Sequence, residues 1–127
     1  MEDAELVWMS PHMHYRGKDM TITAIYPNGE SEIALRVPKF RFEWQIGYEL
    51  AEPIRLPKYS QIMITGHFDN SANNPDNSDP NQTVYYGDMS WEEMFTGFIG
   101  LIMDKDVDPT KIIREDVPVS AASASGG

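Results

Sequence analysis

The sequence predicts an all-β protein, an antiparallel β-sandwich of the jelly-roll type. Two observations lead to this fold class. Apolar and polar residues alternate in several short segments, and turn-forming residues separate these segments about every ten residues. The chain of 127 residues has room for a single domain. The one helical signal is a single turn at residues 90–93, where Ser90 and Glu93 have capping-box spacing.

The first predicted strands form a hairpin. Residues 20–26 have large apolar side chains or alanine at the even positions, and we expect these to face the core. Asn28-Gly29 then forms a turn, and residues 32–37 form the returning strand. Asn-Gly between two β segments is a strong hairpin signal. Prolines 53 and 57 are expected in a connection. Further strands are predicted at residues 61–68, 83–86 and 95–103.

Residues 40–50 have the longest alternation in the chain. All the even positions are large and apolar, and the odd positions are polar or glycine. A period of two over such a length predicts one strand with one buried face. We therefore expect Trp44 in the core.

The remaining segments suggest how the chain is organised. We expect residues 1–7 to be an N-terminal extension, residues 8–117 the domain, and residues 118–127 a disordered tail or linker. No signal-peptide pattern precedes the domain. The acidic start and the linker-like end favour a domain cut from a longer protein, exported to the periplasm or the extracellular space.

Composition excludes several classes of function. The net charge of -10 makes nucleic acid and anionic membrane surfaces poor partners, and no apolar run is long enough to span a membrane. The absence of cysteine excludes disulfides, thiolate metal sites and cysteine nucleophiles. Three histidines limit imidazole-based metal chemistry to about one site.

The polar segment 70–80 offers a different kind of site. Asp69, Asp76 and Asp79 are oxygen donors of the type that calcium prefers. Their spacing matches no EF-hand, so we expect a solvated loop.

His12 and His14 are the strongest metal candidates. Residues two apart on a strand project from the same face, so both imidazoles can reach one ion. His67, a carboxylate or a methionine must complete the site: methionine favours copper, and a carboxylate favours zinc or iron. His67 is a further ligand, an outer-shell group, a proton shuttle or a structural histidine oriented by Asp69; the residues alone leave this open.

Two motifs resemble a known family. Residues 10–18, Ser-Pro-His-Met-His-Tyr-Arg-Gly-Lys, and residues 87–94, Gly-Asp-Met-Ser-Trp-Glu-Glu-Met, are similar to segments of the C-terminal domain of copper type II, ascorbate-dependent monooxygenases. That family includes peptidylglycine α-hydroxylating monooxygenase and dopamine β-monooxygenase. The resemblance covers residues 8–103 and is greatest to bacterial members. It implies a jelly roll with one copper ion on His12, His14 and Met94.

The resemblance also implies an activity. The family activates dioxygen to hydroxylate a C–H bond of a small organic substrate, with ascorbate or another reductant as electron donor. Its complete enzymes carry a second, histidine-rich copper domain, which three histidines cannot supply. We therefore expect an oxygen-activating half that is incomplete without an electron-donor domain or protein. Ser10 and Phe98 stand where the peptide-hydroxylating branch has arginine and tyrosine, so peptidylglycine is not the expected substrate.

Two other functions remain open. One is a non-catalytic copper module for storage, delivery or sensing that uses the same His₂Met site. The other is a β-sandwich interaction or carbohydrate-binding module in which the histidines are incidental. Glu92 and Glu93 are expected to cap a turn and face solvent, because adjacent side chains point in different directions. The aromatic residues that such a module would use for stacking are Trp8, Trp44, Tyr85, Tyr86 and Trp91.

Overall fold

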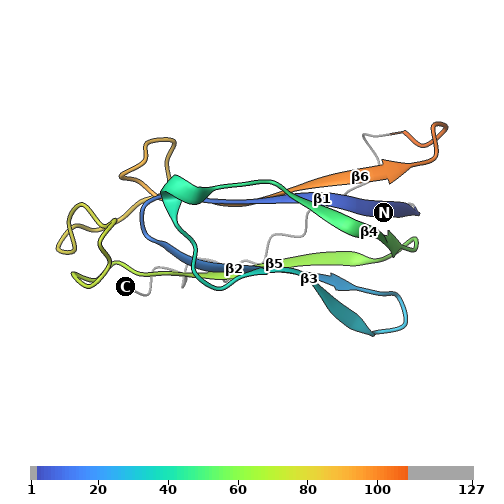
Figure 1. Ribbon diagram of the computed structural model, residues 1–127, viewed down its shortest axis with the longest axis horizontal. Helices are drawn as coiled ribbons and strands as arrows, with labels where there is room; N and C mark the ends of the chain where they lie inside the picture. The colour runs from blue at the N-terminus through green and yellow to red at the C-terminus, as the bar shows by residue number, and fades with distance from the viewer. Residues whose placement is uncertain (1–2, 109–127) are drawn as a thin grey trace.

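The computed structural model describes residues 3–108, which fold into two three-stranded antiparallel sheets that lie as two layers (Figure 1). The first sheet has the order β4-β1-β6 and the second has the order β3-β2-β5. The all-β prediction is confirmed. A jelly roll typically has about eight strands, whereas the described residues form six, so the jelly-roll type stays a prediction. The strands are β1 (Ala4–Met13), β2 (Gly17–Ile25), β3 (Ser31–Val37), β4 (Tyr48–Leu56), β5 (Gln61–Phe68) and β6 (Phe95–Met103).

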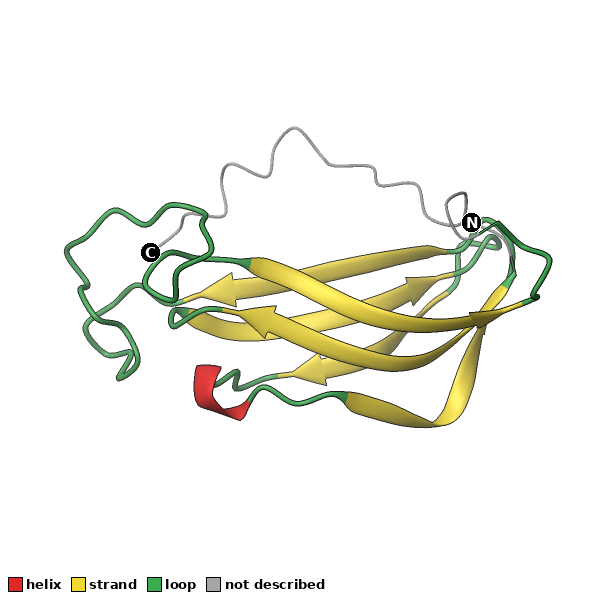
Figure 2. Cartoon of the chain, turned by 90° about the horizontal axis from the view of Figure 1, so that it is seen from above, coloured by secondary structure: helices red, strands yellow, loops and turns green. Residues whose placement is uncertain are grey.

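A tight turn carries the chain from the first sheet to the second. The Gly17 amide donates to the His14 carbonyl at 3.0 Å, so β1 and β2 are joined by only three residues. The short 3₁₀ helix η1 (Phe42–Trp44) lies at the same end of the molecule as the long loop between β5 and β6 (Figure 2). The end of β1, η1 and the β5–β6 loop therefore gather around one end of the sheets.

The core lies between the two layers. Leu6, Met9 and Leu56 from the first sheet pack with Ile22 and Ala24 from the second, and all five are fully buried. At the loop end, a second cluster contains Met13, Met20 and Phe40. The expected burial of the even-numbered residues of the 20–26 segment is confirmed at positions 20, 22 and 24. Burying apolar side chains from both sheets is what holds the layers together.

Gly97 allows the two layers to approach each other closely. A Cβ atom built at this position would lie 2.5 Å from Ile64 Cδ1, across the core in β5. A larger residue would therefore require the Ile64 side chain to move.

The prediction of one strand over residues 40–50 is wrong. Residues 42–44 form η1, and β4 begins only at Tyr48. Phe40 is buried, but Trp44 is 76% exposed and Ile46 is 52% exposed. This segment crosses from one sheet to the other, so its alternating residues have no neighbouring strand along their whole length and do not share one buried face.

Several other elements differ from the predicted ones. The predicted strand at 83–86 is reduced to an isolated bridge between Tyr86 and Glu93. The predicted helical turn at 90–93 is a β-turn, closed by the Glu92 amide and the Met89 carbonyl at 2.9 Å. Pro53 lies inside β4, where an edge strand tolerates the missing N–H group.

The boundaries of β5 and β6 agree with the predicted strands, and those of β2 and β3 agree to within a few residues. Residues 4–7, expected in an N-terminal extension, belong to β1. The expected tail at 118–127 and the expected end of the domain at residue 117 lie outside the described residues. Within residues 3–108, no helix is long and apolar enough to cross a membrane.

β1 contains an irregularity close to its start. Its register with β6 shifts between Leu6 and Trp8, so that Val7 is an extra residue on the β1 side. The register with β4 shifts at the same place. Such a β-bulge bends a strand and increases its local twist.

Candidate metal centre

The structure brings His12 and His14 together at the loop end of β1. Met9, Pro11 and Met13 are buried on the face of β1 that packs against the second sheet. His12 alternates with them, so it lies on the outer face, where it is half-buried. His14 follows the last residue of β1 and is only 4% exposed.

The two imidazole rings have a separation that suits a shared ion. Their centroids lie 5.1 Å apart, and the planes are nearly perpendicular at 86°. Imidazoles that bind one ion through Nε2 at about 2.0–2.1 Å have ring centres roughly 4.5–5.5 Å apart at ordinary bond angles. The separation of 5.1 Å falls within this range.

Gln45 holds the His12 ring. Its Oε1 atom lies 2.6 Å from His12 Nδ1, and its Nε2 amide group donates to the carbonyls of Phe42 at 3.1 Å and Met13 at 3.4 Å. Because those two carbonyls only accept, the amide nitrogen must face them and the amide oxygen must face His12. His12 Nδ1 is therefore the protonated nitrogen, which leaves Nε2 with a free lone pair.

A backbone carbonyl does the same for His14. Its Nδ1 atom lies 3.2 Å from the carbonyl oxygen of Glu92, which can only accept, so this nitrogen also carries the proton. In protein metal sites, a ligating histidine almost always donates its other ring N–H to such an acceptor. In both imidazoles this arrangement leaves the Nε2 lone pair free to bind a metal.

Met94 lies directly before β6, and the strand register relates it to this pair. β1 and β6 pair Met13 with Phe95 and His12 with Thr96, and continuing this register by one residue places Met94 opposite His14. Met94 and His14 both lie just beyond the ends of their strands, so the extended register alone relates them. The Met94 side chain is half-buried.

Within residues 3–108, no three His, Asp or Glu side chains gather in a group that could hold a metal ion. A metal site on the His12–His14 pair would therefore need a third donor of another type.

Glu93 connects the two sequence motifs through hydrogen bonds. Its carboxylate accepts hydrogen bonds from the backbone N–H groups of His14 at 3.1 Å and Arg16 at 3.0 Å. Glu93 is 8% exposed, and burial raises the pKa of its carboxyl group, although the two backbone donors and the nearby positive charge act in the opposite direction. The expectation that Glu93 faces solvent is wrong, because the β1–β2 turn encloses its carboxylate. Glu92 is half-buried, and its carboxylate accepts from the Met89 amide at 3.1 Å.

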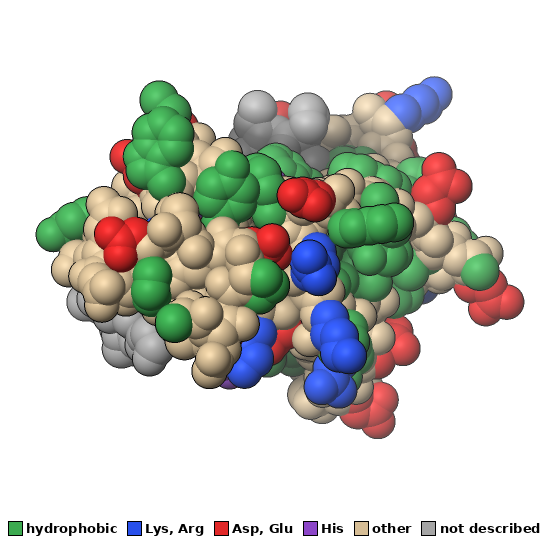
Figure 3. All heavy atoms as spheres, turned by 60° about the vertical axis from the view of Figure 1, so that its left-hand side comes forward, with side chains coloured by type: hydrophobic (Ala, Val, Ile, Leu, Met, Phe, Trp, Pro, Cys, Tyr) green, Lys and Arg blue, Asp and Glu red, His purple; other side chains and the backbone are tan. Residues whose placement is uncertain are grey.

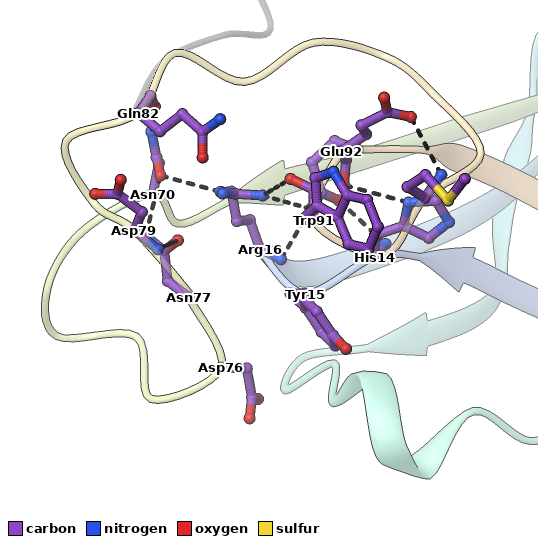
Figure 4. A network of polar contacts seen from close by, with 12 residues as sticks. His14, Tyr15, Arg16, Asn70, Asp76, Asn77, Asp79, Gln82, Trp91 and Glu92 are labelled. Atoms are coloured by element: carbon purple, nitrogen blue, oxygen red, sulfur yellow. Dashed lines mark hydrogen bonds and ion pairs between the residues drawn. The ribbon is translucent and has the colours of Figure 1, made fainter.

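Arg16 connects this turn to the long loop. The side chain is 1% exposed, and it donates to the Trp91 carbonyl at 2.6 Å and to Asn70 Oδ1 at 3.1 Å (Figure 4). Its Nη2 atom is buried without a hydrogen-bond partner. The arginine fixes the segment that precedes Met94 against the end of β1.

His67 does not join the pair. It projects from the second sheet with a side chain that is 75% exposed, and its Nδ1 atom lies 2.8 Å from Asp19 Oδ1. Asp69, which was expected to orient it, instead accepts from the Ser71 amide at 2.9 Å, and hydrogen bonding to Ser71 lowers the pKa of the Asp69 carboxyl group.

The other acidic residues of the loop also have partners. Asp76 Oδ2 lies 3.3 Å from Arg41 Nε, and Asp79 accepts from the Asn81 amide at 2.9 Å. The structure therefore uses these carboxylates to shape the loop and its contact with the 39–47 segment.

Large apolar side chains are exposed near the histidine pair. Phe98 is 52% exposed, and its ring centroid lies 6.2 Å from that of His12. Hydrophobic side chains form several separate patches on the view that brings the loop end forward (Figure 3). The segment that leads to Met94 contributes Tyr85, Tyr86, Met89 and Trp91, each more than half exposed.

Sequence reasoning identified the histidine pair but missed its supporting residues. The alternation of residues 40–50 predicts Gln45 on the solvent-facing side of a strand, and no sequence pattern assigns a role to Arg16. The comparisons with protein-family models, curated proteins and solved structures give no match for this chain.

Proposed function

We propose that this domain binds one copper ion through His12, His14 and Met94, as the oxygen-activating half of an ascorbate-dependent copper monooxygenase. The observation that carries the proposal is the shared tautomer of the two histidines. Both Nδ1 atoms face obligate acceptors, and the rings lie 5.1 Å apart. A surface histidine without a metal role needs neither a fixed acceptor at Nδ1 nor a second imidazole at this distance.

The donor set favours copper over the alternatives. Imidazole suits several transition metals, but a thioether is a soft donor that favours Cu(I), and the chain has no cysteine to offer. Zinc and non-haem iron sites usually add a carboxylate or a third histidine, and no such group of three occurs in residues 3–108.

The residues around the pair suit oxidation of a small organic molecule. Copper held there would supply dioxygen binding and one-electron chemistry. Gln45 and the Glu92 carbonyl keep the two rings oriented, so the two imidazoles would hold the ion with little rearrangement. His12 is half-buried beside the exposed Phe98 ring, which gives a substrate access to one side of the pair.

The remaining parts of the proposal follow from the family resemblance. They are the jelly-roll class, a C–H bond as the site of hydroxylation, ascorbate or another reductant as electron source, a separate electron-donor domain or protein, and an exported location. His67 lies on the other sheet and is paired with Asp19, so it is not available for a second site beside His12.

A non-catalytic copper carrier is the second candidate. The capacity for one ion, with His14 only 4% exposed, is compatible with holding copper without turning over. Both candidates share the same ligands, and they differ in what the loaded protein does with a reductant.

Copper binding tests the shared part of both candidates. Competition with a coloured Cu(I) chelator is expected to give one ion per chain, and His12→Ala, His14→Ala and Met94→Leu are expected to weaken binding. Variants with wild-type affinity would refute the ligand assignment. Ascorbate-driven oxygen consumption by the copper-loaded protein then separates the candidates, because a carrier consumes none beyond the control lacking His12 and His14.

A further inference from the structure

We propose that Gln45 is a positioning residue that sets the tautomer of His12 and thereby the affinity of its Nε2 atom for copper. The inference rests on the proposed function for the metal itself. Its structural part, the tautomer of the ring, does not require a metal to be present.

The first step is the orientation of the Gln45 amide. The amide nitrogen is held by the carbonyls of Phe42 and Met13, at 3.1 and 3.4 Å, and the amide oxygen lies 2.6 Å from His12 Nδ1. Turning the amide by 180° would place N–H groups against the ring and oxygen against two carbonyls. Gln45 therefore presents only an acceptor to His12.

The second step is the rigidity of the segment that carries Gln45. The backbone bond from the Trp44 amide to the Arg41 carbonyl closes η1 immediately before it. Gly47, two residues further on, lies so close to the Trp8 indole that a Cβ atom would overlap the ring. The segment is thus fixed against the outer face of β1 at both sides of Gln45.

The third step is the effect on the imidazole. A neutral histidine in water favours the tautomer with hydrogen on Nε2, which blocks the nitrogen needed here. A hydrogen-bond acceptor at Nδ1 reverses that preference, and the Nε2 lone pair is then free to bind a metal ion. Loss of such an outer-shell partner typically weakens metal binding by about 10- to 100-fold.

The experiment compares the wild type with Gln45→Leu, which lacks the acceptor and adds no metal donor. Gln61→Leu is the matched control, because Gln61 is exposed on β5 of the other sheet. The first readout is the ¹⁵N NMR spectrum of the metal-free protein at a pH where His12 is neutral, and the second is the Cu(I) affinity from chelator competition.

We expect His12 to carry its proton on Nδ1 in the wild type and in Gln61→Leu, and to shift toward the Nε2–H form in Gln45→Leu. The Cu(I) affinity of Gln45→Leu should fall by about 10- to 100-fold. Unchanged tautomer populations in Gln45→Leu would overturn the proposal. So would an unchanged affinity in a protein whose wild type binds Cu(I) through His12.

A second variant separates loss of the acceptor from a general structural defect caused by substitution at position 45. Gln45→Glu keeps an oxygen acceptor at the same reach, so His12 is expected to keep hydrogen on Nδ1. A shift as large as in Gln45→Leu would count against the acceptor role. If the wild type binds no Cu(I) while the tautomers behave as expected, the proposed function fails and the positioning role of Gln45 stands.

Discussion

Arg16 Nη1 lies 3.7 Å from Glu93 Oε2, in a buried ion pair that joins the β1–β2 turn to the segment before β6. The same carboxylate accepts backbone hydrogen bonds from His14 and Arg16. The two motifs that carry the candidate ligands are therefore fastened to each other by protein groups. A metal ion that binds there would meet ligand segments whose backbones are already fixed relative to each other.

Removing the Glu93 carboxylate should destabilise the fold. Glu93→Ala leaves the buried Arg16 charge and two backbone N–H groups without their acceptor, and breaking a buried ion pair typically costs about 3–5 kcal/mol. Glu93→Gln keeps one oxygen and should cost less. Urea denaturation measures both. Equal stability of the alanine variant and the wild type would contradict the role of this carboxylate.

The Glu93 carboxyl should also contribute to the pH dependence of stability. Its pKa is raised in the folded state, so folding favours the protonated form. Its contribution is therefore fully present below the unfolded pKa, near the ordinary glutamate value, and is lost as pH rises through the raised folded pKa. Glu93→Gln cannot titrate there. The free energy of unfolding of the variant should rise relative to that of the wild type as pH increases across this window.

The measurement is a set of urea denaturation curves for both proteins between acidic and neutral pH. The other carboxylates titrate in both proteins and cancel in the difference. A difference that stays constant, or that moves in favour of the wild type with rising pH, would show that the Glu93 pKa is not raised.

His67 should make no contribution to copper binding at the proposed site. Its side chain is 75% exposed on the second sheet and is paired with Asp19. His67→Ala should keep wild-type Cu(I) affinity and a stoichiometry of one, whereas His12→Ala should not. Loss of affinity in His67→Ala, measured by the same chelator competition, would mean that the third histidine takes part.

Phe40 and Trp44 should respond oppositely to truncation, although they belong to one alternating pattern. Phe40 is 7% exposed within the cluster of Met13 and Met20, so Phe40→Ala should cost about 3–5 kcal/mol. Trp44 is 76% exposed, and Trp44→Ala should lie within about 0.5 kcal/mol of the wild type. Thermal or urea unfolding of the two variants decides this. Similar losses in both would restore the interpretation of residues 40–50 as one buried face.

The contrast between these two aromatic residues shows how far local patterns reach. β5 could be predicted because it alternates over the length along which it pairs with β2, and β6 because it is a continuous, mostly apolar run that pairs along its length with β1. Residues 40–50 alternate equally well, but they must cross between sheets before β4 starts to pair with β1 at Tyr48. Nothing within the segment signals where that crossing ends.

The candidate site is likewise only partly predictable from the sequence. The histidine pair is visible because its two members lie within three residues of sequence. Gln45 is 33 residues from His12, and Glu93 is 79 residues from His14. These partners are defined only by the packing of η1 and the β5–β6 loop against the end of β1, which no spacing rule encodes.

The bulge at Val7 has a consequence for the whole length of β1. Before it, the even-numbered Ala4 and Leu6 face the core; after it, the odd-numbered Met9 and Met13 do. The bulge accommodates the extra residue, so the parity of the core positions changes along the strand while each half keeps its pairing with β6. Deleting Val7 would join Leu6 to Trp8 in regular alternation, with Leu6 and Met9 still facing the core and His12 still facing outward. The face that carries the histidine pair is therefore set by the pairing of residues 8–13 with β6 and tolerates a change of one residue at the bulge.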